Sequence, residues 1–223
     1  MKRVVLTGAS DGLGRAFGVE CVKNGVDVVA LCRKQPDYEC AFLSTDLTSK
    51  ESMKASCKRI INEFSEFDAL INCAGVQKVQ DTGNINYDKI DELFKVNTLA
   101  PIFLTSELFG CIKQFNSDIL NVGSTCGTKA GYHGEVAYTT SKWGLRGTSY
   151  TLQAELKATG CRVIQFNPGG MNTRIKAKDT GIEVSDPENW MTPDDIAKIM
   201  FYILSLPKQI EVSEITINRK VAV

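Results

Sequence analysis

The sequence Thr7-Gly8-Ala9-Ser10-Asp11-Gly12-Leu13-Gly14 joins a predicted strand at residues 3–7 to a predicted helix at residues 13–23. Its glycines would let the backbone turn tightly and approach a phosphate group, which the N-terminus of the following helix would stabilise. The spacing is G-x-x-x-G-x-G, which differs from the common dinucleotide fingerprint G-x-G-x-x-G. An ordinary glycine-rich turn can carry the same three glycines, so the motif favours a dinucleotide-binding loop without establishing one.

Strand and helix patterns alternate along the rest of the chain. We expect strands at residues 26–31, 41–43, 69–73, 119–122, 162–166 and 214–217. We expect helices at residues 50–64, 87–113, 136–158 and from Thr192 to about residue 205, and Pro101 should kink or divide the second of these. This alternation predicts an α/β fold: a Rossmann-type, doubly wound, mostly parallel sheet with helices on both faces, in a single domain over residues 1–223. Ligands of such sheets bind beyond the carboxyl ends of the strands.

Composition argues against several classes of function. The 223 residues include 26 basic and 26 acidic side chains, so no nucleic-acid partner is expected, because phosphate binding usually leaves a basic excess. No apolar run approaches the ~18 residues of a membrane span, and the N-terminus does not resemble a signal peptide. The eight cysteines are scattered and His133 is the only histidine, so we expect reduced thiols and no metal site. These features predict a soluble cytoplasmic protein.

The second predicted strand ends at Leu31-Cys32-Arg33, without an acidic residue. In dinucleotide-binding folds an acid at this place binds the ribose 2′-hydroxyl of NAD, whereas an arginine accommodates the 2′-phosphate of NADP. Arg33 and Lys34 could also be an ordinary solvated basic pair. The pattern favours NADP(H) over NAD(H).

Tyr138 and Lys142 lie four residues apart on a predicted helix, which puts both side chains on one face. A nearby ammonium favours the phenolate, so Lys142 should lower the pKa of Tyr138 from about 10 and make it a usable acid or base. Ser124 follows an apolar strand, where its hydroxyl could hold a substrate carbonyl oxygen. Asn97 is an amide in an apolar helical setting and needs a partner or a purpose. The Y-x-x-x-K spacing by itself is common and would indicate only a surface helix.

Six motifs in order resemble the short-chain dehydrogenase/reductase family over nearly the whole chain. They are T-G-x-x-x-G-x-G at Thr7 to Gly14, N-N-A-G as Asn72-Cys73-Ala74-Gly75 with Cys73 replacing one asparagine, Asn97, Ser124, Tyr138 with Lys142, and P-G-x-x-x-T from Pro168-Gly169 to Thr173.

The resemblance implies a role for each of these residues. Tyr138 would be the general acid in carbonyl reduction, Lys142 would hold the nicotinamide ribose and lower the tyrosine pKa, and Ser124 would hydrogen-bond the substrate oxygen. Asn97 would position a water in a proton relay from Lys142, and Thr173 would contact the carboxamide end of the cofactor. Residues implied for cofactor binding are Gly8, Ser10, Asp11, Gly12, Leu13, Gly14, Arg33, Asp46, Leu47, Asn72, Ala74, Gly75, Tyr138, Lys142, Pro168, Gly169 and Thr173, with Asp46 at the adenine; no residue is assigned to a metal.

Three places depart from the family's pattern or leave a choice open. Only about a dozen residues separate Arg33 from Asp46, where most relatives fit another helix, so we expect a more open adenine side. Thr125 stands beside Ser124 and could be the hydroxyl that contacts the substrate. The substrate-side segment at residues 172–191 is short, and His133 is expected to be a solvated loop residue rather than part of the cleft.

The predicted function is an NADP(H)-dependent oxidoreductase acting on a small-molecule carbonyl or secondary alcohol. Two alternatives stay open: an NAD-dependent alcohol dehydrogenase of the same family, and a non-catalytic NADP-binding regulatory or scaffold protein. The resemblance also implies a homodimer or homotetramer that pairs through the two long helices carrying Asn97 and Tyr138. Neither the substrate nor the physiological direction is contained in these residues.

Overall fold

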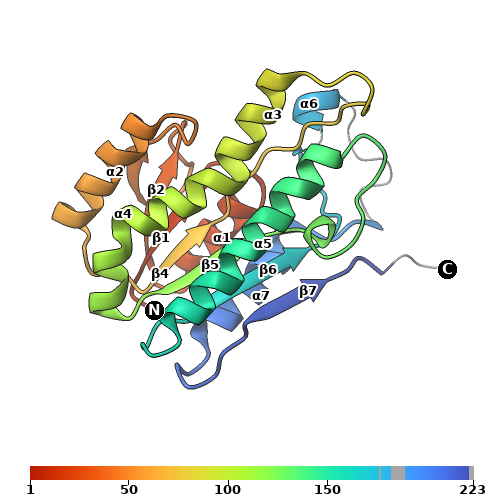
Figure 1. Ribbon diagram of the computed structural model, residues 1–223. Coiled ribbons are helices and arrows are strands. Elements are labelled where there is room, and N and C mark those ends of the chain that lie inside the picture. The colour runs from red at the N-terminus through yellow and green to blue at the C-terminus, as the bar shows by residue number, and fades with distance from the viewer. Residues whose placement is uncertain (176, 182–188, 221–223) are drawn as a thin grey trace.

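The computed structural model describes residues 1–175, 177–181 and 189–220 of the chain. Every strand of this described part lies in one parallel sheet of seven strands, in the order β3-β2-β1-β4-β5-β6-β7 (Figure 1). The strands are β1 (Arg3–Thr7), β2 (Asp27–Cys32), β3 (Ala41–Ser44), β4 (Ala69–Asn72), β5 (Asp118–Val122), β6 (Val163–Pro168) and β7 (Glu214–Ile217). The order steps outward from β1 in both directions, so the predicted doubly wound fold is confirmed, with a sheet that is parallel throughout.

Helices cover both faces of the sheet (Figure 1). On one face lie α1 (Gly12–Lys23) and α7 (Pro193–Ser205), and on the other lie α2 (Lys50–Glu63), α4 (Ala100–Phe115) and α5 (Val136–Leu156). The remaining elements are α3 (Tyr87–Phe94), α6 (Ala177–Thr180), the π-helix η1 (Lys95–Leu99) and the 3₁₀ turn η2 (Thr125–Gly127). In the described part of the chain, no helix is long and apolar enough to span a membrane.

Alternate residues of each inner strand pack into different cores. Val4 and Leu6 of β1 share a cluster with Phe17 of α1 and Met200 of α7, whereas Val5 packs on the opposite side, with the core beneath α2 and α4. This alternation explains why the strands are continuous apolar runs: a parallel strand covered on both faces has no side that water reaches.

The long helical stretch after residue 87 is divided, as Pro101 predicts. The division lies just ahead of the proline, in η1, where the Ala100 N–H donates to the Lys95 carbonyl five residues back. Pro101 has no N–H to offer the Asn97 carbonyl, so the ordinary helical ladder is broken at this turn. Single π turns of this kind are frequent at functional sites, and this one carries Asn97.

The connection from β2 to β3 contains no helix and folds back on α1. Arg15 of α1 binds Asp37 through two hydrogen bonds of 2.8 and 2.7 Å, and the Tyr38 hydroxyl donates to the Ala9 carbonyl at 3.2 Å. Gly18 leaves the room that the Tyr38 ring occupies, since a Cβ there would lie 2.0 Å from its hydroxyl oxygen. The short connection is therefore fixed beside the phosphate-loop motif.

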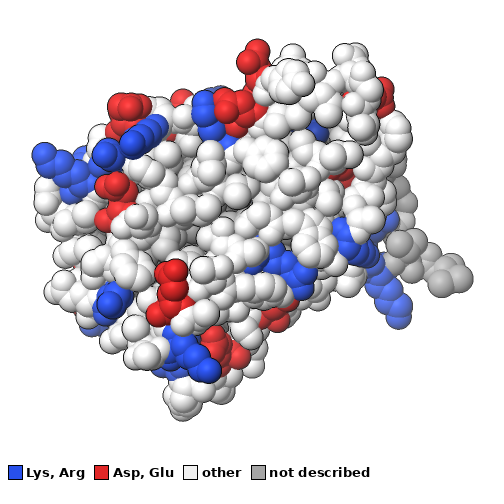
Figure 2. Space-filling view, viewed as in Figure 1, with Lys and Arg blue, Asp and Glu red and all other residues white. Residues whose placement is uncertain are grey.

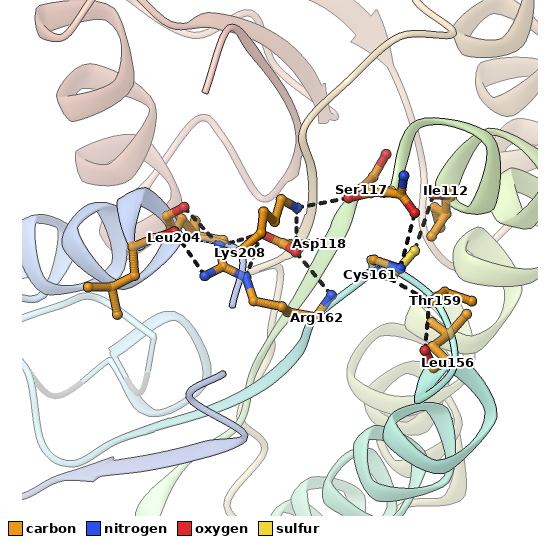
Figure 3. A network of polar contacts seen from close by, with 12 residues as sticks. Ile112, Ser117, Asp118, Leu156, Thr159, Cys161, Arg162, Leu204 and Lys208 are labelled. Carbon is orange, nitrogen blue, oxygen red and sulfur yellow. Dashed lines mark hydrogen bonds and ion pairs between the residues drawn. The ribbon is translucent and has the colours of Figure 1, made fainter. Parts of the chain in front are cut away.

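The amino ends of β5 and β6 meet in an ionic cluster of the buried Asp118 and Arg162 with the exposed Lys208 (Figure 3). Arg162 donates to Asp118 Oδ2 from Nη2 at 2.7 Å and from Nε at 3.2 Å, and Lys208 Nζ donates to Oδ1 at 2.7 Å. The guanidinium also donates to four backbone oxygens just after or at the end of α7, those of Leu204, Leu206, Pro207 and Ile210. The cluster ties the sheet to the C-terminal end of that helix.

Candidate active site

Most of the sequence-predicted site residues lie at or just after the carboxyl ends of strands, whereas Asn97 lies on η1, and Tyr138 and Lys142 lie on α5. The end of β1 contacts the turn that follows β4: the Thr7 hydroxyl oxygen accepts from the backbone N–H groups of Cys73 and Ala74, both at 3.0 Å. Gly8 lies so close to this turn that a Cβ on it would come within 2.8 Å of Ala74 Cα. The glycine-rich loop and the Asn72–Gly75 motif therefore form one continuous surface.

The glycine-rich loop has the shape of a phosphate cradle. Gly8 and Gly12 have φ of 70° and 52°, a region that favours glycine, and a Cβ on Gly14 would lie 2.2 Å from the Gly8 carbonyl oxygen. Asp11 caps α1 by accepting from the Gly12 N–H at 2.7 Å, and Thr173 lies beside Gly12, 3.7 Å from where its Cβ would be. The bare backbone at a helix N-terminus fits the diphosphate of a dinucleotide.

Lys142 and Asn97 converge at the end of β4. A Cβ on Gly75 would lie 3.6 Å from both Lys142 Nζ and Asn97 Oδ1. The Asn97 amide is fixed by the backbone of Val76, whose N–H donates to Oδ1 and whose carbonyl accepts from Nδ2, each at 2.8 Å. Asn97 Nδ2 also donates to the Ser141 hydroxyl at 3.1 Å. The buried amide thus has the partners that the sequence required of it.

The side chains of Tyr138 and Ser124 are both buried and lie close together. Burial raises the pKa of Tyr138, Ser124 opposes that rise, and the nearby Cys126 and Glu135 add to it. Lys142 Nζ lies 5.8 Å from the centre of the phenol ring. The expectation that Lys142 lowers the tyrosine pKa is therefore not met in the protein alone, because desolvation outweighs the distant ammonium. Tyr138 is a phenol, ready to donate a proton.

Lys142 is an almost completely buried cation. Its Nζ donates to the Val122 carbonyl, the last of β5, at 2.9 Å. Burial lowers its pKa to about 8, and the neighbouring Cys73 and Cys126 oppose that fall. The ammonium is thus held at the edge of the sheet with one backbone acceptor from the described part of the chain.

The family model described as short chain dehydrogenase matches residues 2–181. The chain belongs to the short-chain dehydrogenase family. An uncharacterized oxidoreductase of Listeria monocytogenes is 25% identical, with 97% of this chain and 96% of that protein covered. The structure of an alcohol dehydrogenase from the archaeon Thermococcus sibiricus, complexed with 5-hydroxy-NADP, has a TM-score of 0.87 at 22% identity, covering 97% of this chain and 96% of that one. A metagenomic short-chain oxidoreductase in complex with NADP has a TM-score of 0.83 at 25% identity, covering 99% and 98%.

Sequence reasoning missed a buried carboxylate in this oxidoreductase, that of Glu135. Gln77 Nε2 donates to its Oε1 at 2.6 Å, and the Tyr132 N–H and the Cys126 thiol donate to its Oε2 at 3.3 and 3.6 Å. Three donors from separate parts of the chain therefore surround the two carboxylate oxygens. In the sequence, Glu135 is an acidic residue ahead of a predicted helix, with no pattern that marks it as functional. Its contacts with Gln77 and Cys126 in the structure place it at the site.

Arg33 and Asp46, which the sequence analysis assigns to the adenine side, lie near each other after β2 and β3. Arg33 lies close enough to Asp46 to help lower its pKa, although the larger causes are the hydrogen bonds from the backbone and hydroxyl of Thr48. Leu47 beside it is buried. Asn72 differs from expectation: its Nδ2 donates to Asn121 Oδ1 at 2.8 Å inside the sheet. Its side chain points into the interior and leaves the cleft to Ala74 and Gly75.

Three remaining expectations concern Thr125, His133 and metal ligands. Thr125 opens η2, whereas the hydroxyl of its neighbour Ser124 lies close enough to Tyr138 to lower the pKa of the phenol, which favours Ser124. His133 is exposed, with its ring 3.7 Å from Asp81, as expected of a loop histidine. The described residues contain no group of three or more His, Cys, Asp or Glu side chains placed to hold a metal ion.

Proposed function

We propose that this oxidoreductase is NADP(H)-dependent and transfers a hydride between the nicotinamide and a carbonyl or secondary alcohol. One observation carries the proposal: the buried Tyr138 phenol lies close enough to the Ser124 hydroxyl for that hydroxyl to lower its pKa, and Lys142 Nζ lies 5.8 Å from the centre of the same ring. The cofactor would supply or accept the hydride. The chain would supply the proton, the orientation and the electrostatic environment.

The protein's own groups divide this work. Ser124 would hold the substrate oxygen by a hydrogen bond, and Tyr138 would donate its proton to that oxygen during reduction or remove it during oxidation. Lys142 would bind the ribose hydroxyls of the nicotinamide and stabilise negative charge on Tyr138 as the proton leaves. Asn97, whose two amide atoms are held by Val76, would position a water through its neighbouring backbone in a proton relay from Lys142.

The preference for NADP(H) is supported by the end of β2. Arg33 is exposed there with Lys34, no acidic residue takes the position that binds a ribose 2′-hydroxyl, and two similar structures are described with NADP or a derivative of it. The dinucleotide would lie along Gly8, Ser10, Asp11, Gly12, Leu13 and Gly14, then Arg33, Asp46 and Leu47, then Ala74, Gly75, Pro168, Gly169 and Thr173. An NAD-dependent alcohol dehydrogenase is the second candidate, favoured only if Arg33 proves to be a solvated surface residue.

We also propose that the chain is a single domain with a short substrate-side segment. The segment at residues 172–191, of which residues 176 and 182–188 lie outside the described residues, is the part of the chain that we assign to a small-molecule substrate. A cytoplasmic location agrees with the eight free cysteines, all of which lie in described residues.

A homo-oligomer is supported by the exposed face of α4 and α5. Leu99, Ile102, Val136, Trp143 and Tyr150 are large hydrophobic side chains exposed on η1, α4 and α5. Figure 2 shows this side of the molecule with uncharged side chains over much of its middle. Pairing through this face would bury apolar area that water otherwise covers. Light scattering on the purified protein would distinguish a dimer from a tetramer, and a monomer at micromolar concentration would contradict the proposal.

Turnover tests the proposed chemistry. We expect NADPH oxidation, followed at 340 nm, with at least one carbonyl from a panel of aldehydes, diketones, β-keto esters, keto acids, quinones and sugars. Tyr138→Phe should lower kcat by about 10²–10⁴-fold, because it deletes the proton donor and keeps the ring. Its affinity for NADPH should stay within about twofold, since the ring still fills the same space.

Two outcomes would contradict parts of this account. Wild-type turnover by Tyr138→Phe would contradict the assignment of the proton donor. NADPH binding without turnover of any carbonyl or alcohol, in either direction, would favour a regulatory or scaffold protein over an enzyme.

A further inference from the structure

Two adjacent residues of opposite charge on α6 contact two separate parts of the chain, the glycine-rich loop and the region from Val79 to α3. Lys178 Nζ lies 2.6 Å from Asp11 Oδ2 on the glycine-rich loop. Asp179 lies against the connection between β4 and α3 and against α3 itself. Figure 1 shows α6 beside α3, at the end of the molecule where the carboxyl ends of the strands lie. The four residues of this helix therefore bridge two walls that are far apart in the sequence.

The Asp179 side chain is mostly buried and is held by two hydrogen bonds and one longer ion pair. The Val79 N–H donates to Oδ2 at 3.0 Å, Lys89 Nζ donates to Oδ1 at 3.2 Å, and Lys78 Nζ lies 4.0 Å from Oδ1. Burial by itself would raise the pKa of Asp179, but the Val79 amide and the two lysines hold it below its usual value. Lys78 also pairs with Glu92 of α3 at 2.9 Å. This side of the bridge is a built contact and not a chance pair of surface charges.

Lys178 neutralises a charge that is badly placed for a polyphosphate. Asp11 caps α1 inside the loop that fits a diphosphate, so its carboxylate would repel that ligand. The pairing with Lys178 cancels the charge, and Arg174 also contributes to lowering the pKa of Asp11, although burial opposes the shift. The cations that cover this loop thus come from the segment after Thr173, which itself lies beside Gly12.

We propose that Lys178 and Asp179 are positioning residues that fasten the segment after Thr173 across the cleft and so retain the bound dinucleotide. Lys178 fastens it to the phosphate loop through Asp11, and Asp179 fastens it to Val79 and Lys89. The proposal rests on the proposed function, because it assumes that a nicotinamide dinucleotide occupies the cleft. It adds a prediction of its own: neither residue touches the reacting atoms, yet both control how quickly the cofactor leaves.

Cofactor release measures the two fastenings directly. NADPH bound to the full-length protein is chased with excess NADP⁺, and its fluorescence is followed in a stopped-flow instrument. We expect about two- to fivefold faster release from Lys178→Ala, since its ion pair is partly exposed. Asp179→Ala should release NADPH about tenfold faster, because it leaves the part-buried Val79 N–H without its acceptor. Lys89→Met, on an exposed side chain, should also accelerate release and does not endanger folding. Release rates at the wild-type value in all three variants would overturn the proposal.

Matched controls and a double mutant separate this effect from a general loss of charge. Lys198→Ala removes an exposed lysine paired with Asp195 at 3.3 Å, and Asp91→Ala removes an exposed acid of α3 paired with Lys95; both should release NADPH at the wild-type rate. In an Asp11→Asn background, Lys178→Ala should have less than about twofold further effect, because its partner is gone. A full effect in that background would mean that Lys178 binds the cofactor directly, and it would overturn the role given to Asp11.

Hydrogen exchange tests the fastening without any cofactor, so that its failure differs from failure of the proposed function. In the protein alone, Asp179→Ala should increase exchange at the Val79 amide and at the amides of residues 178 and 181, which bond back to Arg174 and Ala177. Asp91→Ala should change neither. Unchanged exchange in Asp179→Ala would overturn the fastening even if NADPH binds, whereas altered exchange together with no NADPH or NADH binding would contradict the proposed function instead.

Discussion

A buried charged side chain lies at each end of β5, and the two differ in how many hydrogen-bond partners they have. At the amino end, Asp118 accepts from both Arg162 and Lys208, and the arginine satisfies four backbone oxygens besides (Figure 3). At the carboxyl end, the Val122 carbonyl is the hydrogen-bond acceptor that the described residues offer to the Lys142 ammonium. Asp118, Arg162 and Lys142 are almost fully buried, whereas Lys208 is exposed.

This difference in partners distinguishes a charged cluster that stabilises the fold from a charged side chain that is available to bind a ligand. A buried ion pair costs desolvation that only complete partnering offsets, and the Asp118 cluster has that partnering. Lys142 does not, so its burial is a cost to folding that a purely structural site would not retain. Buried groups with strongly perturbed pKa values gather at functional sites for this reason.

The largest effect on stability is expected at the amino end of β5. Arg162→Met should lower the free energy of unfolding by about 3–5 kcal/mol, because it leaves Asp118 buried with half its partners. Urea denaturation measures this, and Arg59→Met, which removes an exposed arginine paired with Glu63 on the same helix, should cost under about 0.5 kcal/mol. Turnover per folded molecule should stay near the wild-type value. If Arg162→Met lost more activity than folded protein, the amino end of β5 would also contribute to catalysis, which contradicts the purely structural role given to it.

At the carboxyl end of β5, removing the charged side chain is expected to stabilise the protein. The folded-state pKa of Lys142, about 8, is below its unfolded value of 10.5, so the buried ammonium destabilises the protein below pH 8. Lys142→Met should therefore raise the free energy of unfolding at pH 7 by about 1–3 kcal/mol, and this gain should fade as pH rises from 8 toward 10.5, where folded wild-type protein no longer carries the charge. The same variant should lose turnover. If Lys142→Met instead lowered the free energy of unfolding equally at pH 7 and near pH 10.5, Lys142 would be a structural residue like Arg162.

Cofactor preference gives a smaller effect. Arg33→Ala should weaken NADPH binding by about ten- to a hundredfold, the usual worth of a hydrogen-bonded charge on a phosphate, and should leave NADH binding within about twofold. Fluorescence titration with both cofactors measures it, and Lys23→Ala, on an exposed lysine at the end of α1, is the control. Equal losses for NADPH and NADH would remove Arg33 from the recognition of the 2′-phosphate.

The dependence of activity on pH is the mildest of these tests. If the protonated form of Lys142 supports turnover, kcat/KM should fall by up to about tenfold per pH unit above a midpoint near 8, as the ammonium loses its proton. The raised pKa of Tyr138 keeps the phenol protonated over the same range. A profile that stays flat beyond pH 9.5 would contradict the role given to Lys142.

Residues that act within a short stretch of chain were predictable. The glycine-rich turn, the strand ends before Arg33 and Ser124, and the i, i+4 pair Tyr138 and Lys142 follow from spacing alone, and the strand and helix boundaries agree to within a few residues. Pro101 likewise marked the break in the long helix, because a missing N–H acts locally. Such features depend on backbone chemistry that each residue carries with it.

Residues that act through distant partners were not predictable. The buried state of Glu135 depends on Gln77, 58 residues away, and the anchoring of Asp179 depends on Val79, 100 residues away. Arg162 looked like the start of a strand until Asp118, 44 residues away, made it the centre of a cluster. Asn72 was assigned to the cofactor through the resemblance of its motif to that of the family, yet the alternation of a strand turns its side chain to Asn121 in the interior.

Titration of the wild-type protein with NADPH and with NADH is the most direct test, because it needs no knowledge of the substrate. We predict saturable binding of NADPH, seen as enhanced nicotinamide fluorescence, with an affinity at least about tenfold above that for NADH. Binding of neither cofactor at millimolar concentration would contradict the account of the carboxyl edge of the sheet as a dinucleotide site, and a preference for NADH would contradict the role of Arg33.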